Sequence, residues 1–187
     1  MDSNAVIART RRWISAVVIG LNLCPFARRV FESDTIRYVV SAAEDEKALL
    51  ADLTRELQAL ASTPSTTVET TLLIHPQVFT NFLEYNDFLD IAEQRLELLG
   101  LDGVIQIATF HPAYQFADTA ADDVENYTNR SPYPMLHLLR EESISRIADD
   151  PDELLKIPER NIETLRAMGK QTILEMLKEI EVDEKPK

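Results

Sequence analysis

Short apolar stretches and longer amphipathic stretches alternate along the first 111 residues of the chain. The apolar stretches are rich in β-branched and aromatic residues, as in strands buried on both faces, and they are "TIRYVVS" (35–41), "VETTLLIH" (68–75) and "GVIQIATF" (103–110). Between them, leucines recur at helical spacing from Leu49 to Leu60, and a second apolar stripe runs from about Thr80 to a stop at Gly100. This order predicts right-handed parallel crossovers. We therefore expect an α/β fold with a small three-stranded, mainly parallel sheet (βαβαβ).

Helical patterns flank this core on both sides. Residues 4–20 have apolar positions at near-helical spacing with arginines interleaved, and "NLCPFARR" is expected to be a loop or short turn. "SPYPMLHLLREESISRIAD" indicates a helix that Ser131 caps and whose first turn holds two prolines, where they cost little. One or two closing helices with a break at Gly169 end the pattern.

The length of 187 residues suits one domain with a sizeable core. The apolar content of 45% and the absence of low-complexity tracts indicate a globular protein. We divide the predicted domain (1–187) into an N-terminal helix and Cys-Pro loop (1–30), a βαβαβ core (35–111), a polar functional loop (112–132), C-terminal helices (133–180) and a frayed tail (181–187).

The net charge of −13 argues against nucleic acid as a partner, because phosphate binding needs concentrated positive charge. The charge is uneven: the first 40 residues hold six arginines and a net charge of +3, and the rest holds −16. The basic end is interpreted either as a solvated helix face or as a region that attracts an anionic ligand. No run reaches the roughly 20 apolar residues that span a membrane, so no membrane partner is expected.

The single cysteine, Cys24, cannot form an internal disulfide, which predicts a cytoplasmic protein. "RRWISAVVIGLNLC" has the arginines, apolar run and cysteine of a lipoprotein signal. Leu23 stands before the cysteine, however, where such signals need a small residue, so export is the weaker interpretation.

Two of the three histidines stand where predicted strands end, each followed by a proline. If the strands are parallel, His75, His111 and Ser41 lie at one edge of the sheet. Open α/β sheets bind ligands outside the carboxyl ends of their strands. His111 is the stronger candidate because a long polar loop follows it, and such loops in compact domains are usually functional or disordered. The alternative is that both histidines only terminate strands.

The polar loop and the helix predicted after it supply the candidate ligand-binding residues. Free N–H groups at a helix start favour an anion, which Arg130 would hold there. The set is Tyr114, Asn126, Asn129, Arg130, Ser131 and Arg140. On that helix, His137, Arg140 and Glu141 would share one face. In the alternative interpretation, Arg130 pairs with the acidic run between Asp118 and Glu125.

Cys24 is open to three interpretations. It is a small buried residue, a thiolate activated by a nearby histidine or arginine, or a metal ligand. A metal site through His75, His111 and His137 is a minor possibility, because the spacings match no compact ligand pattern. No cofactor is predicted, and Walker, GxGxxG, GxSxG and CxxC motifs are absent.

Three stretches together, "GLNLCPFA", "ATFHPAYQFADT…DDVENYTNRSPYPMLHLLREESI" and "IPERNIETLR", resemble the bacterial domain-of-unknown-function family 1415. The resemblance covers nearly the whole chain. It implies a small single-domain protein and supplies no substrate, cofactor or catalytic residue.

The first functional hypothesis is an enzyme that acts on a small phosphate- or carboxylate-bearing molecule. His111 would be the acid or base, Cys24 a nucleophile, and His137 an orienting group or second acid or base, while Arg130 binds the anion. The second is a non-catalytic binding module for an anionic ligand or partner. The third is a protein with a histidine-bound metal. The sequence indicates no oligomeric state.

Overall fold

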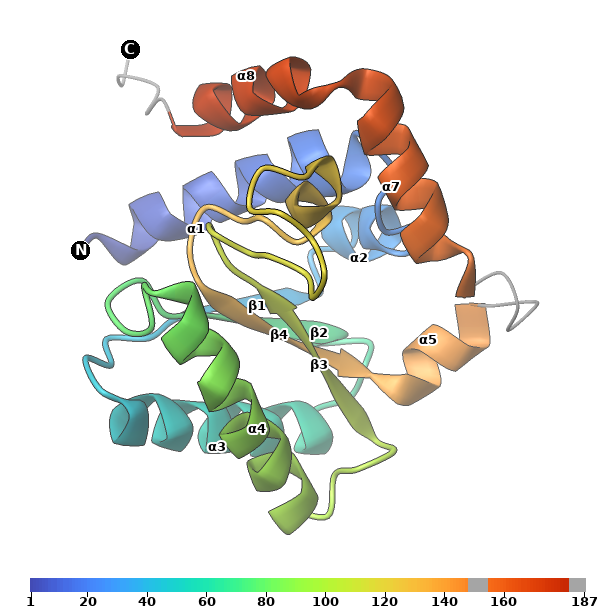
Figure 1. Cartoon of the computed structure of the whole chain (residues 1–187). Helices are drawn as coiled ribbons and strands as arrows, with labels where there is room; N and C mark the ends of the chain where they lie inside the picture. The colour runs from blue at the N-terminus through green and yellow to red at the C-terminus, as the bar shows by residue number, and fades with distance from the viewer. Residues whose placement is uncertain (148–154, 182–187) are drawn as a thin grey trace.

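The computed structural model describes residues 1–147 and 155–181, and within these ranges helices cover both faces of a four-stranded sheet (Figure 1). The strands are β1 (Ile36–Val40), β2 (Thr70–Ile74), β3 (Ile105–Phe110) and β4 (Met135–Arg140). Their order is β1-β2-β4-β3, with β1 and β2 parallel and β4 antiparallel to both of its neighbours. The predicted α/β class and the shared direction of β1, β2 and β3 are therefore confirmed.

The prediction of a three-stranded, mainly parallel sheet is wrong because "MLHLLR" forms strand β4 between β2 and β3. Leucine, methionine and arginine favour helices intrinsically, and a short apolar run fits either structure. The neighbouring strands decide the outcome, because β2 and β3 both have backbone groups that need partners and β4 supplies them as a strand. The helix that we expected to begin after Ser131 is α5, which begins at Glu141 (Glu141–Ile147). The last two positions of that expected helix, 148 and 149, lie outside the described residues.

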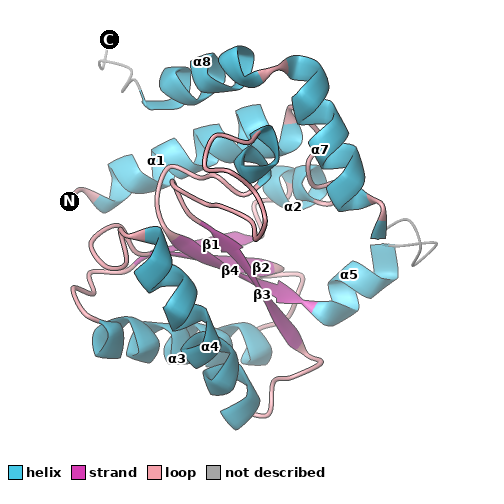
Figure 2. Cartoon of the chain, in the orientation of Figure 1, coloured by secondary structure: helices cyan, strands magenta, loops and turns pink. Residues whose placement is uncertain are grey.

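Helices α3 (Glu46–Ser62) and α4 (Phe82–Leu98) cover one face of the sheet, as Figure 2 shows below the strands. The side chain of Asp45 accepts the N–H of Ala48 at the start of α3, and Asn81 does the same for the N–H of Leu83 in α4. These caps satisfy donors that a helix start leaves free. The predicted leucine stripe of α3 packs with α4 and with inward residues of the sheet in one apolar core.

The opposite face is covered by α1 (Ser3–Trp13), its continuation as a π-helix η1 (Ile14–Ile19), α2 (Ala27–Glu32), α7 (Ile157–Met168) and α8 (Lys170–Glu181). The predicted break at Gly169 is confirmed, because this residue has a φ of 83° and separates α7 from α8. The end of the stretch expected to be a loop, "ARR", instead begins α2. The polar loop after β3 lies on this side and contains a 3-10 turn, η2 (Val124–Thr128). Positions 182–187 of the predicted tail lie outside the described residues.

Arginines of the basic N-terminal segment bind groups of the chain itself. Arg9 and Arg12 donate to the carbonyls of Glu181 and Ile180, at the C-terminal end of α8, where the helix dipole favours cations. Arg11 pairs with Asp34 at 3.2 Å. These contacts support the interpretation of the basic end as a helix face rather than a ligand site. Within the two described ranges, no helix is both long enough and apolar enough to cross a membrane.

Candidate functional site

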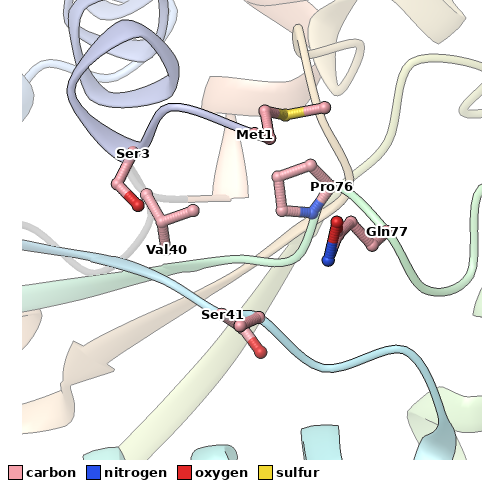
Figure 3. A pocket seen from close by; sticks show the side chains of 7 residues that line it. Met1, Ser3, Val40, Ser41, Pro76 and Gln77 are labelled. Carbon is pink, nitrogen blue, oxygen red and sulfur yellow. The ribbon is translucent and has the colours of Figure 1, made fainter.

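The residues after β1, β2 and β3 lie at one edge of the sheet, as expected, and a small cavity opens there (Figure 3). Its volume is about 80 Å³, and it is lined by Met1, Ser3, Val40, Ser41, Ala42, Pro76 and Gln77. The Ser41 hydroxyl donates to the Asp52 carboxylate at 2.6 Å. A water molecule takes about 30 Å³ of liquid volume, so this cavity has room for two or three waters. A metabolite needs a larger space.

The two His-Pro strand ends have closely related surroundings. Nδ1 of His75 donates to the carbonyl of Val78 at 3.0 Å, and Nε2 of His111 donates to the carbonyl of Phe79 at 3.1 Å. Both rings also lie against the Tyr85 ring of α4, with centroid distances of 5.7 Å for His75 and 5.2 Å for His111. The two histidines therefore fasten one loop and the start of α4 to the end of the sheet.

Both ring nitrogens of His111 are bound to the main chain. Besides the bond from Nε2, Nδ1 accepts the N–H of Ala113 at 3.0 Å, so the ring is the neutral Nε2–H tautomer. Only 1% of the residue is exposed. Burial lowers the pKa of His111, with the carbonyl bond to Phe79 acting in the opposite direction. His111 is thus held neutral with no ring nitrogen free to meet a substrate.

His75 differs from His111 in the hydrogen bonding of one ring nitrogen. Its Nε2 has no hydrogen-bond partner among the described residues, and the residue is fully buried. Burial lowers the pKa of His75 to about 4, and the neighbouring His111 adds to the effect. A protonated ring would place an unpaired N–H and a charge in this core, which is costly.

His137 lies on the other face of the sheet from His111. It stands in β4, opposite Leu72 and Ala108, and its ring is 6.3 Å from that of Phe110, in the core under α1 and α8. Thr70 gives its hydroxyl proton to the Leu138 carbonyl at 2.6 Å, so its oxygen accepts from Nε2 of His137 at 2.7 Å. Burial lowers the pKa of His137 to about 4. The structure therefore does not bring the two candidate acid–base histidines together.

Arg130 is not at a helix start, which corrects the geometry on which its anion-binding role was predicted. Its guanidinium donates to the carbonyls of Tyr114 at 3.2 Å and Ala121 at 2.6 Å. It also lies over the Tyr127 ring, 4.2 Å from the centroid. These contacts tie together the two arms of the polar loop. The bonds to carbonyls also differ from the pairing with the acidic run that we considered as the alternative.

Other candidate ligand-binding residues organise the same loop. Asn126 is fully buried, accepts the N–H of Phe116 and the hydroxyl of Thr119, each at 2.9 Å, and donates to the carbonyl of Ala120. Ser131 donates to the Tyr133 carbonyl rather than capping a helix. Asn129 donates to the Thr109 carbonyl at 3.0 Å and so fastens the loop to β3.

Arg140 does not share a helix face with His137 and Glu141, because it is the last residue of β4. It donates to the carbonyls of Leu60 and Thr63, at the C-terminal end of α3, and to that of Val68 before β2. The last carbonyls of a helix lack a full set of intrahelical partners, and a cation at the end of α3 also meets the negative end of the helix dipole. The contacts give Arg140 a structural role.

Cys24 lies on the α7 side of the molecule, in a layer different from that of His111. The loop that holds it is bound by α7: Arg160 donates to the Asn22 carbonyl at 3.1 Å and Asn161 to the Leu23 carbonyl at 2.7 Å. Burial raises the pKa of the Cys24 thiol, and the charge of Arg160 offsets only part of this. The side chain is thus a partly buried thiol rather than a thiolate at neutral pH.

A metal centre was the minor prediction for His75, His111 and His137. Across the described ranges, no group of three or more histidine, cysteine, aspartate or glutamate side chains could hold a metal ion. The position of His137 on the opposite face from His111 gives the physical reason.

A larger hollow separates the polar loop from α7, and we call it the loop–helix groove. Its volume is about 490 Å³, within the usual size of ligand sites. It is lined by Phe116, Thr119, Glu125, Thr128, Asn129, Pro158, Asn161 and Ile162. Asn129 is the one candidate ligand-binding residue among them. The α7 side contributes Asn161, which is 9% exposed and whose Oδ1 has no hydrogen-bond partner in the described part of the chain.

Sequence reasoning missed the α7 side of this groove. A signal was available, because Asn161 stands four residues before Leu165 on the buried stripe of α7. An asparagine at such a position of a helix is unusual and calls for a partner, since buried amides are normally hydrogen-bonded. What the sequence could not indicate is that this stripe faces residues 116–129.

Comparison with known proteins gave one match. A family model described as "Protein of unknown function (DUF1415)" matches residues 5–175. Neither the curated proteins nor the solved structures contain a significant match to the chain.

Proposed function

The chain belongs to the DUF1415 family, and we propose that it is a small-molecule binding protein whose ligand occupies the loop–helix groove. The observation that carries this proposal is the groove itself, with a volume of about 490 Å³ and an unpartnered amide oxygen on a residue of its wall. Buried polar groups are normally satisfied, so an unpaired oxygen on a residue that lines a ligand-sized hollow favours a missing donor.

The state of the candidate catalytic groups supports binding over chemistry. A useful general base near neutral pH has a pKa close to 7 and a nitrogen within reach of the substrate. The pKa of His137 is about 4, and both nitrogens of His111 are bound to the main chain. The raised pKa of Cys24 weakens it as a nucleophile.

An enzyme acting on a small anionic molecule is the second proposal. The charge of Arg160, which lowers the pKa of Cys24 in part, supports it. Here Cys24→Ser would abolish turnover of an activated ester such as p-nitrophenyl phosphate or p-nitrophenyl acetate and leave binding in the groove unchanged. Equal background hydrolysis by both proteins would remove this proposal.

The binding proposal is tested with an uncharged probe that combines an apolar body with one donor. We would titrate ¹⁵N-labelled full-length chain with 2-phenylethanol and follow the amide resonances. The expected shifts cluster at residues 116–129 and 158–162. Ile162→Trp narrows the groove and should abolish them, whereas the control Leu98→Trp, at a site 80% exposed on α4, should not. Shifts scattered over the surface, or equal in both variants, would refute the proposal.

A further inference from the structure

The side chains of the loop–helix groove offer more hydrogen-bond acceptors than donors. Thr119 gives its hydroxyl proton to the Phe116 carbonyl or the Asn126 side-chain oxygen, at 2.8 and 2.9 Å. Thr128 gives its proton to the Glu125 carbonyl or the Asn129 side-chain oxygen, at 2.8 and 3.0 Å. A hydroxyl has one proton, so each oxygen faces any further neighbour as an acceptor.

The two asparagines of the lining each donate one amide N–H to a main-chain carbonyl. The amide nitrogen of Asn129 donates to the Thr109 carbonyl, and that of Asn161 donates to the Leu23 carbonyl. Each amide nitrogen keeps one further N–H, and the Asn161 Oδ1 is a buried acceptor without a donor among the described residues. A ligand that bonds to the hydroxyl oxygens of Thr119 and Thr128 must bring N–H or O–H groups of its own.

The one ionisable side chain that lines the groove is acidic. Glu125 is the ionisable residue of the lining, and its carboxylate receives Arg166 Nη2 at 2.9 Å on one oxygen. Its own backbone N–H, and then Arg166, hold the pKa of Glu125 below its usual value, so the group is ionised at neutral pH. Of the nearby cations, Arg166 pairs with Glu125 itself, Lys170 pairs with Asp122 at 2.9 Å, and the hydrogen bonds of Arg130 go to two carbonyls.

The start of α7 does not make the groove a binding site for anions. A helix start attracts anions through its free N–H groups. Pro158 stands in this first turn and lacks an N–H, and the carboxylate of Glu159 already complements the dipole there. The apolar part of the lining is Phe116, Pro158 and Ile162, and the Phe116 ring is 36% exposed. An exposed aromatic face attracts a cation.

We propose that the ligand of the loop–helix groove is an amine: an ammonium group on an apolar body, with the ammonium near Glu125 and Asn161 and the body against Phe116 and Ile162. This inference rests on the proposed function of the groove and specifies its ligand class. It replaces the phosphate- or carboxylate-bearing ligand expected from the sequence. An ammonium supplies three donors and the opposite charge, whereas an anion would meet acceptors and a carboxylate.

The test compares three probes that share one apolar body: phenethylamine, 2-phenylethanol and 3-phenylpropionate. Each is titrated into ¹⁵N-labelled full-length chain at about pH 7.5 and constant ionic strength. We expect phenethylamine to shift resonances of residues 116–129 and 158–162 with up to about fivefold higher affinity than 2-phenylethanol, which is the upper end of what a partly exposed ion pair contributes. We expect no shifts there from 3-phenylpropionate.

A matched pair of variants isolates the charge. Glu125→Gln should reduce the affinity for phenethylamine to that for 2-phenylethanol and leave the alcohol unaffected. Glu163→Gln removes the same charge from an exposed position of α7 outside the groove, so the affinity for phenethylamine should stay unchanged.

The outcomes separate the two claims. Groove shifts from 3-phenylpropionate but not from phenethylamine, or equal affinities for amine and alcohol in the native chain, overturn the amine class and leave the binding function standing. The amine class is also overturned if both variants lower the affinity for phenethylamine equally. The absence of groove shifts with all three probes overturns the binding function itself.

Discussion

His75 is expected to make the folded chain less stable as the pH falls from about 7.5 to about 5. In the folded chain its ring is fully buried, Nε2 has no partner among the described residues, and the pKa is lowered from 6.5 to about 4. The unfolded chain takes up this proton as the pH falls through 6.5, whereas the folded chain does not until about 4. The stabilisation is therefore complete above 6.5 and is lost progressively as the pH falls to 4.

The size of the effect follows from these two pKa values. At pH 5 the unfolded histidine is almost fully protonated and the folded one almost fully neutral, which lowers the free energy of unfolding by about 2 kcal/mol. His137, whose pKa is also about 4, acts in the same direction, and so does His111. A loss of this size is a large fraction of the usual 5–15 kcal/mol stability of a domain.

Urea unfolding at a series of pH values between about 7.5 and 5 measures this loss, and most carboxylates stay ionised over that range. His75→Asn retains an amide donor for the Val78 carbonyl and removes the titrating ring, so its pH dependence should be smaller by about 2 kcal/mol. Tyr85→Phe loosens the same cluster by removing the bond to the Met135 carbonyl, and it should retain the full pH dependence. A native chain equally stable at both pH values, or His75→Asn with an unchanged dependence, would refute the reasoning.

Three further predictions follow from individual contacts. Arg37→Ala leaves the Glu56 carboxylate, 1% exposed, without its bond at 2.8 Å, while Arg55 stays 3.6 Å from the same carboxylate. The free energy of unfolding should fall by about 2 kcal/mol and recover in the double variant that adds Glu56→Leu. Arg140→Lys replaces the planar guanidinium by a single ammonium, which cannot donate to all three carbonyls at once. In the same urea assay, the free energy of unfolding should fall by about 2 kcal/mol. Cys24, with its raised pKa, should react with iodoacetamide at about pH 7.5 at least about tenfold more slowly than glutathione, and an equal rate would contradict its burial.

Much of the fold could be read from local patterns. The leucine stripe of α3, the apolar strands β1 to β3, and the break at Gly169 were all predicted, because periodicity and a glycine with positive φ act over a few residues. Strand β4 could not be read in the same way. Its leucines suit a helix, and its strand conformation depends on partners at 70–74 and 105–110.

The candidate site, like the fold, was predictable only in part. The sequence correctly indicated that Ser41, His75 and His111 follow strands that end at one edge of the sheet, since a strand–helix–strand order determines direction. It could not indicate that both nitrogens of His111 would bind main-chain groups, or that His137 would face the opposite side.

By itself, the sequence determined the apolar periodicity of the helices and strands, the charge, and the side chains available at each position. Only the tertiary structure decided which of those side chains keep a free hydrogen-bonding atom. Arg130, Arg140 and Asn126 are occupied by carbonyls and amides that folding brings to them from other elements. Asn161 and the polar loop form a groove because α7 packs against η2, some 35 residues earlier in the chain. The availability of a polar atom depends on such long-range contacts, and no local pattern encodes them.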